Sequence, residues 1–173
     1  NIADKATVAG VEIEIRKNLF VRPVSNAAHG MNKLSLGLNG SYIYTNAKMP
    51  LATVTTGSQL EGAAPWIVNF DLSHNFTKGE RSFVNTLVLN YVSDKIYTIG
   101  TQGYQDIMEQ GVLTLDFVSQ AKLNKHLSLN LKARNLLNPS YKLSRKANEN
   151  GEKVILNDYK KGINISLGVS CTF

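Results

Sequence analysis

Long stretches in which apolar and polar residues alternate constrain this chain more than any other feature. From position 163 to 173 every second residue is Ile, Leu, Val, Cys or Phe, and Asn, Ser, Gly or Thr fills the positions between. A similar alternation runs through 34–45 and 66–77. Because successive side chains of an extended strand point to opposite faces, the pattern predicts strands with one apolar and one polar face.

Seven strands of this kind are predicted. They cover residues 6–18, 33–47, 65–77, 82–97, 109–124, 127–140 and 158–173. At roughly 13 to 16 residues they exceed the strands of soluble proteins, which average about 5 to 6, whereas a tilted strand that crosses a bilayer needs about 9 to 11. No run reaches the roughly 18 apolar residues of a membrane-spanning helix. The expected fold is all-β, an antiparallel meander that forms a segment of a transmembrane β-barrel.

The links between the predicted strands differ in length. Residues 78–81 and 124–126 form tight turns, whereas the links 48–64, 98–108 and 141–157 are long. Short turns on one side and long loops on the other are typical of outer-membrane barrels, whose long loops are extracellular. The link 19–32 is long although it lies on the short-turn side, so we expect an unusual turn there.

Aromatic residues gather near both ends of the predicted strands. Those near the long loops are Tyr42, Tyr44, Trp66, Tyr91 and Tyr97, and those near the short turns are Phe76, Phe83, Phe117 and Phe173. Two belts of this kind are typical of the two membrane–water interfaces of a barrel. A soluble carbohydrate-binding β-sandwich would also alternate and remains an alternative, as does a small complete barrel acting as an adhesin or porin.

The odd number of predicted strands leads us to expect further strands upstream of residue 1. Single-chain bacterial barrels usually have an even number of strands. An open sheet edge in hydrocarbon would leave backbone N–H and C=O groups without partners, so seven strands alone should not persist in a membrane.

Sequence patterns of other functions are missing. The histidines His29, His74 and His126 lie far apart, and no metal-ligand spacing, phosphate loop or nucleophile motif is visible. Glu12 and Glu14 share a strand face, but no catalytic partner accompanies them. Despite the net charge of +6, Lys and Arg form no basic stripe, which argues against a nucleic-acid partner. The sequence therefore predicts neither an enzyme nor a cofactor.

Four segments follow one another in an order that resembles a known family. They are Ala-Gly-Val-Glu-Ile-Glu at 9–14, Leu-Glu-Gly-Ala-Ala-Pro-Trp-Ile-Val-Asn at 60–69, residues 95–103 with 106–109, and Arg-Asn-Leu-Leu-Asn-Pro at 134–139. Together they resemble the C-terminal barrel region of TonB-dependent receptors, especially those of Bacteroidetes. The resemblance implies that 1–173 are the last strands of a barrel of about 22 strands with a plugged lumen. The plug domain and the TonB box would lie outside this chain.

The resemblance also implies a function. Receptors of this kind sit in the outer membrane of Gram-negative bacteria and actively import a scarce nutrient such as an iron chelate, cobalamin, a glycan or a peptide. Partners implied by it are the rest of the barrel and the plug, TonB, the barrel-assembly machinery, the lipid bilayer and, in some receptors, a surface lipoprotein lid. Residues 1–173 would supply barrel wall and three extracellular loops.

Three groups of residues are candidates for functional roles. The terminal residues Ser166, Gly168, Cys171 and Phe173 fit a pattern that resembles the signal read by the barrel-assembly machinery. In the link 98–108, Tyr104 and Asp106 are candidate ligand contacts. Candidate contacts to the plug, on the predicted polar faces, are Glu12, Glu14, Asp71, Lys132 and Arg134. The reason for the last group is that an ionisable side chain at membrane depth must pair or face water.

Overall fold

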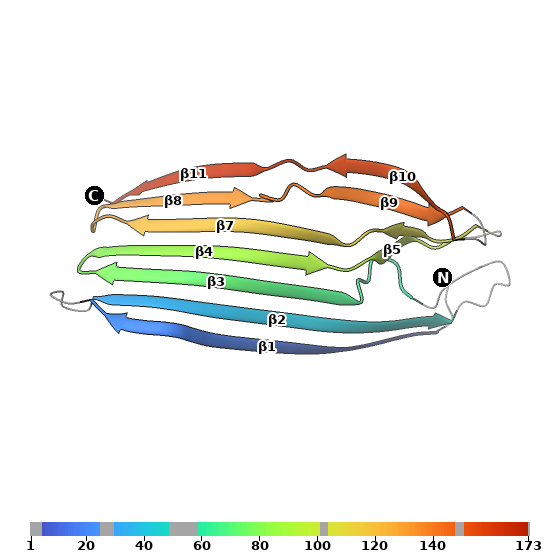
Figure 1. Ribbon diagram of the computed structural model, residues 1–173, viewed down its shortest axis with the longest axis horizontal. Helices are drawn as coiled ribbons and strands as arrows, with labels where there is room; N and C mark the ends of the chain where they lie inside the picture. The colour runs from blue at the N-terminus through green and yellow to red at the C-terminus, as the bar shows by residue number, and fades with distance from the viewer. Residues whose placement is uncertain (1–4, 25–29, 49–58, 101–103, 148–150, 173) are drawn as a thin grey trace.

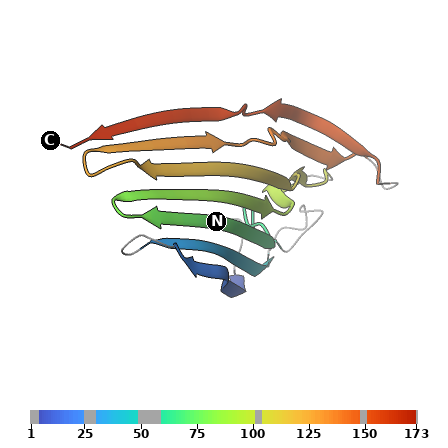
Figure 2. The ribbon, with the colours of Figure 1, turned by 60° about the vertical axis from the view of Figure 1, so that its left-hand side comes forward.

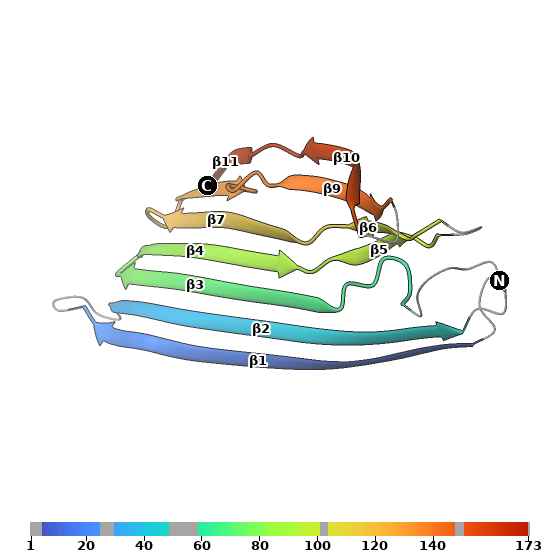
Figure 3. The same cartoon turned by 45° about the vertical axis from the view of Figure 1, so that its right-hand side comes forward.

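The computed structural model is one layer of antiparallel strands (Figure 1). It describes residues 5–24, 30–48, 59–100, 104–147 and 151–172. In these ranges no helix is long and apolar enough to cross a membrane. In Figure 2 the strands near the N-terminus are foreshortened, and in Figure 3 those near the C-terminus are. The strand direction therefore rotates steadily across the layer, as the twist of a β-sheet requires.

Seven strands form the main sheet. In spatial order they are β1 (Lys5–Pro23), β2 (Met31–Lys48), β3 (Trp66–Lys78), β4 (Arg81–Val92), β7 (Val112–Lys122), β8 (Leu127–Arg134) and β11 (Asn164–Cys171). Every neighbouring pair is antiparallel. The predicted all-β antiparallel meander is thereby confirmed, as an open sheet whose two edges are β1 and β11.

A second sheet continues the main one at the long-loop end. Its strands are β10 (Lys153–Lys160), β9 (Ser140–Lys146), β6 (Ile107–Glu109) and β5 (Lys95–Thr98), in that order. Figures 1 and 3 show β5, β6, β9 and β10 prolonging β4, β7, β8 and β11. Each of these four long strands is therefore interrupted once, at a similar height, and we call this line of interruptions the junction.

The prediction of a long loop at 141–157 was wrong. Most of that stretch belongs to β9 and β10, and only 147–152 connect them. A β-bulge between Ile155 and Asn157 shifts the register, which removes the period of two from the sequence. The hairpin is recognisable only in space, where Tyr141 stacks on Tyr159 at 5.5 Å and Lys142 Nζ lies 3.7 Å from Asp158 Oδ2.

The first two strands are longer than predicted for a related reason. A bulge in β1 between Asn18 and Phe20 interrupts the alternation, so the prediction ended at 18 although pairing continues to Pro23 opposite Met31. The link is thus 24–30 rather than 19–32. Its central residues 25–29, where we expected an unusual turn, lie outside the described residues.

The two faces of the main sheet differ sharply in polarity. One cross-strand row reads Ile15, Leu38, Phe70, Leu89 and Leu115, and the adjacent row on the opposite face reads Glu14, Asn39, Asn69, Asn90 and Thr114. No second layer covers the apolar face, and the only buried apolar residues among those described are Ala47, Ala64, Ile96 and Ala133. A soluble sandwich would bury that face against another sheet, so this alternative does not fit.

Aromatic pairs bound the apolar face. Tyr42 and Trp66 pack at 4.6 Å near the long loops, and Phe76 and Phe83 at 6.3 Å near the short turns. Trp66 and Phe76 are ten residues apart on β3, which is about 34 Å along a strand and about 26 Å across a membrane at a tilt of about 40°. The apolar band of outer-membrane barrels is about 25 Å tall. The spacing of the aromatic belts therefore fits a bilayer.

Candidate functional site

A row of three carboxamides and one carboxylate crosses four strands on the polar face. Asn39, Asn69 and Asn90 lie opposite one another on β2, β3 and β4. Asn39 Nδ2 donates to Glu12 Oε1 of β1 at 2.6 Å, Asn69 Nδ2 donates to Asn39 Oδ1 at 3.3 Å, and Asn90 Nδ2 donates to Asn69 Oδ1. We call these four residues the amide ladder. All its donors point toward the Glu12 carboxylate, and hydrogen bonds aligned in one direction polarise one another.

Glu14, Arg16 and Asp71 form a charged cluster on the same face. Asp71 lies across the backbone of β2 over Gly37, where a Cβ atom would overlap its Oδ1. Gly37 is paired with Asp71 on one side and with Arg16 on the other, and Arg16 forms an ion pair with Glu14. Glycine at 37 therefore lets the Asp71 carboxylate reach toward Arg16.

The candidate plug contacts fall into two separate groups. Glu12, Glu14 and Asp71 lie together on β1 and β3, whereas Lys132 and Arg134 lie on β8, on the far side of β4 and β7. Within the described part of the chain neither Lys132 nor Arg134 forms an ion pair. The polar face thus carries carboxylates near one edge of the sheet and unpaired cations near the other.

The family-like segment at 134–139 forms the interruption between β8 and β9. Asn135 and Asn138 adopt left-handed backbone conformations, with φ of 58° and 43°, which Asn tolerates better than other residues with a side chain. The Asn135 N–H donates to Asp116 Oδ1 at 2.8 Å, and its Nδ2 donates to the Gly162 carbonyl at 2.7 Å. The Gly162 N–H in turn donates to Asn138 Oδ1 at 3.0 Å. The two asparagines therefore bind β7 and the β10–β11 link to the junction.

The segment before Trp66 ties the second sheet to the first. The Gly62 N–H donates to the Ile96 carbonyl at 2.8 Å, and Glu61 Oε1 accepts from the Ile99 N–H at 2.7 Å, so residues 59–65 cover the edge of β5. On the other side the Leu60 N–H donates to Thr45 Oγ1 of β2 at 3.1 Å. Residues of the family-like segment 60–69 thus bridge β2 and β5.

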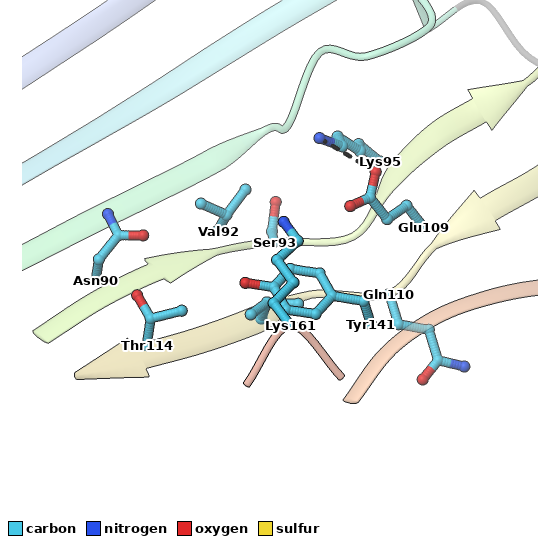
Figure 4. A pocket seen from close by; sticks show the side chains of 10 residues that line it. Asn90, Val92, Ser93, Lys95, Glu109, Gln110, Thr114, Tyr141 and Lys161 are labelled. Atoms are coloured by element: carbon cyan, nitrogen blue, oxygen red, sulfur yellow. Dashed lines mark ion pairs between the residues drawn. The ribbon is translucent and has the colours of Figure 1, made fainter. Parts of the chain in front are cut away.

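A pocket of about 190 Å³ opens on the polar face at the junction (Figure 4). Asn90, the last member of the amide ladder, lines it together with Thr114. The side toward the second sheet carries Lys95, whose Nζ lies 3.3 Å from Glu109 Oε2. Residues from both sheets therefore meet here, and we call the space the junction pocket.

One aromatic ring closes the lower side of the junction pocket. Lys161 Nζ lies 3.8 Å from the centroid of the Tyr141 ring, a cation–π contact. Figure 4 shows the Lys161 chain lying over this ring. The junction pocket therefore offers ammonium, carboxylate, hydroxyl and amide groups to a polar molecule, while the described residues contain no group of His, Cys, Asp and Glu that could hold a metal ion.

The two candidate ligand contacts are placed differently. Asp106 accepts a hydrogen bond from the Gly100 N–H at 2.8 Å and so holds the base of the loop closed. The Tyr104 side chain is 61% exposed and lies under the Arg145 guanidinium, 5.1 Å from ring centroid to Cζ. Tyr104 therefore faces solvent, whereas Asp106 is engaged with the backbone.

The candidate assembly signal lies on the edge strand β11. Cys171 is exposed on the apolar face opposite Leu127, and Ser166 and Gly168 lie on the polar face opposite Lys132 and Asn130. The Thr172 N–H donates to the His126 carbonyl at 2.9 Å, which holds the strand end against the preceding turn. Phe173 lies outside the described residues.

Sequence reasoning missed several of these residues. Alternation placed Asn39, Asn69 and Asn90 on the polar face but did not reveal that register makes them one hydrogen-bonded row. Asp116 and Gly37 were not singled out at all. Their roles depend on partners at least 19 residues away in the chain, so only strand register could identify them.

Comparison with known proteins gives one match. The model of the family described as TonB dependent receptor-like, beta-barrel matches residues 1–136, which is more than half of the chain. No curated protein and no solved structure matches the chain. The matched part contains β1 to β8 and therefore the amide ladder, the charged cluster and most of the junction pocket.

Proposed function

Because this chain belongs to the family of TonB-dependent receptor-like β-barrels, we propose that residues 1–173 are the C-terminal wall of an active transporter in the outer membrane of a Gram-negative bacterium. At the family level the assignment is to outer-membrane receptors that transport, not to enzymes. The proposal adds that the apolar face contacts lipid, that the polar face lines the lumen, and that the second sheet projects outside the cell.

The polarity of the two faces carries this proposal. Large apolar side chains such as Ile13, Trp66 and Leu167 are 62%, 53% and 73% exposed, and nothing in the described structure covers them. In water such a surface would drive association, whereas in hydrocarbon it is the ordinary outside of a barrel. The opposite face carries polar side chains that hydrogen-bond to one another, as a lumen wall should.

The two open edges support the rest of the barrel as a partner. Among the strands that the structure describes, β1 and β11 each have a neighbour on one side only. Each backbone group left without a partner in hydrocarbon would cost several kcal/mol. We therefore propose that both edges pair with further strands of the receptor, in a barrel of about 22 strands. The barrel-assembly machinery would recognise Ser166, Gly168, Cys171 and Phe173 on the last strand.

The charges of the lumen face support contact with a plug. The Lys132 and Arg134 side chains have no ion pair in the described structure, and an unpaired cation at membrane depth needs an anion or water. We propose that acidic groups of the plug face these two cations. Basic groups of the plug would face Glu12, Glu14 and Asp71, three carboxylates that share this part of the face with a single guanidinium, that of Arg16.

The nutrient would enter past the second sheet. Tyr104 is exposed at the long-loop end and is proposed as a ligand contact, and Asp106 as the residue that shapes its loop. The junction pocket lies deeper, where the second sheet meets the lumen wall. Iron chelates, cobalamin, glycans and peptides remain the nutrient classes proposed for the whole receptor, with TonB supplying the energy and a surface lipoprotein as a candidate lid.

Cysteine labelling in the complete receptor tests the two faces. In a Cys171→Ser background without other cysteines, Asn69→Cys and Asp71→Cys should react with a water-soluble maleimide in cells. Phe70→Cys and Leu72→Cys, their neighbours on β3, should react at least tenfold more slowly because lipid excludes the reagent. Equal labelling of all four positions would refute the membrane placement.

Uptake and plug contact are tested separately. Accumulation of the nutrient by cells should require TonB, and accumulation that persists without TonB would contradict active transport. Lys132→Glu should loosen the plug and admit a large antibiotic that the native receptor excludes. The matched control Lys122→Glu, at the end of β7 beside the short turn, should leave exclusion unchanged.

A further inference from the structure

A groove interrupts the apolar face of the main sheet over Gly40. Its volume is about 450 Å³. Ile13 of β1 and Val68 of β3 form its two sides, because both are paired with Gly40 in the strand register. Tyr42 and Trp66 close the end toward the long loops, and Leu38 lies toward the other end.

Nothing in the described structure requires glycine at position 40. Gly40 is not among the glycines with positive φ, so its backbone suits any residue. The register runs without a bulge through Leu38, Gly40 and Tyr42 on both sides of β2. A Cβ atom at Gly40 would meet nothing within 4 Å, whereas one at Gly37 would overlap Asp71.

Glycine inside a regular strand weakens the strand and commonly marks a bulge, a tight bend or the close approach of a ligand or another backbone. The unbroken register excludes the bulge, and the open space over Gly40 shows that no part of the described chain approaches. The space over Gly40 is therefore free for another molecule to approach the backbone of β2 closely.

We propose that the groove over Gly40 binds one acyl chain of an outer-leaflet lipid. The inference rests on the proposed placement of this face in the outer membrane. The groove is lined almost entirely by apolar side chains, which suits hydrocarbon and offers nothing to a polar ligand. Its upper end meets the Tyr42–Trp66 pair of the long-loop belt, which places the groove in the outer leaflet.

The shape of the groove suits a single chain. It is open on one side and bounded by Ile13 and Val68, so one extended chain can lie along it. Neighbouring lipid tails are as apolar as the side chains, so burial of apolar surface does not favour this position over bulk lipid. The preference comes from packing, because a chain lying along β2 touches Ile13, Val68 and the Gly40 backbone at once.

Quenching of Trp66 by brominated acyl chains tests the proposal in the complete receptor in lipid nanodiscs. The Trp66→Phe variant is measured in parallel, so that the difference in quenching reports on Trp66 alone. Gly40→Leu should fill the groove and reduce this difference at least threefold. Ala121→Leu, which adds comparable bulk on the apolar face of β7, is the matched control and should leave it unchanged.

Retention of lipid gives a second measurement that does not depend on Trp66. Native mass spectrometry of the receptor after detergent washing should show one lipid more on the native protein than on Gly40→Leu. Unchanged quenching and retention in Gly40→Leu would overturn the acyl-chain site while leaving the membrane placement intact. Shielding of Trp66 from brominated lipid and aqueous iodide alike would mean that a protein covers the groove. Quenching of Trp66 by aqueous iodide would instead refute the membrane placement itself.

Discussion

Replacement of Asn135 should show how strongly the left-handed backbone at the junction depends on its residue. Asn135 has a φ of 58° and its Nδ2 donates to the Gly162 carbonyl, while its buried Oδ1 has no hydrogen-bond partner among the described residues. Asn135→Ala and Asn135→Gly both remove this side-chain hydrogen bond and this unpartnered oxygen. The difference between the two variants therefore isolates the backbone conformation.

The magnitude follows from two opposing effects. The left-handed conformation costs a residue with a Cβ atom about 1.5 kcal/mol, a cost that glycine avoids. Glycine is itself destabilised by about 0.5 kcal/mol, because it loses more conformational entropy on folding. Asn135→Ala should thus be less stable than Asn135→Gly by about 1 kcal/mol. At about 1.4 kcal/mol for each factor of ten, this difference is about fivefold in the local opening equilibrium.

Hydrogen exchange of the complete receptor measures that opening. The reporting amides are Leu136, which donates to the Leu115 carbonyl at 2.8 Å, and Gly162, which donates to Asn138 Oδ1. Both should exchange about fivefold faster in Asn135→Ala than in Asn135→Gly, and amides in the middle of β3 should be unaffected. Equal exchange in the two variants would refute the role assigned to the left-handed backbone.

Three further substitutions test other contacts by the same exchange measurement. Asn69→Leu should break the amide ladder and leave Asn39 Oδ1 and Asn90 Nδ2 without a protein partner. The loss of about 1 kcal/mol should speed local opening of β2 and β4 about fivefold. Asn75→Leu, on the same face of β3, should leave this opening unchanged. Asp106→Ala should speed exchange at Gly100 about tenfold by removing a charge-assisted hydrogen bond, and Asp106→Asn, which keeps an acceptor, should restore most of the protection. Glu61→Ala should speed exchange at Ile99 and Glu61→Gln should not. Unchanged exchange at the named amide would contradict each role.

The strand pattern of the main sheet could be predicted from the sequence because one face of the sheet is apolar and the other is polar. Wherever a strand obeys that condition, as at 66–77 and 163–171, period two is visible in the sequence. β9 alternates only over Ser140–Ser144, and in β10 the bulge between Ile155 and Asn157 breaks the period. The hairpin at 140–160 was missed for that reason.

Bulges account for the remaining boundary errors. The irregularities between Asn18 and Phe20 and between Ile155 and Asn157 each shift the alternation by one residue. A prediction from the sequence ends the strand at such a point, although backbone pairing continues past it.

The candidate site residues were likewise predicted only in part. Alternation alone places Glu12, Glu14, Asp71, Lys132 and Arg134 on polar faces, and their common face is confirmed by the strand register. Which of them are neighbours depends on strand order, which separates the carboxylates from Lys132 and Arg134. Their contacts with a plug remain predictions.

The sequence by itself thus determined an antiparallel sheet with one apolar face, long strands and aromatic belts, because these follow from local alternation and from where aromatic residues lie along each strand. Only the tertiary structure decided the amide ladder, the approach of Asp71 over Gly37, the junction and the open groove over Gly40. These features arise where residues on different strands meet in register. Register is set by turns, bulges and pairing along whole strands, so no short window of sequence contains it.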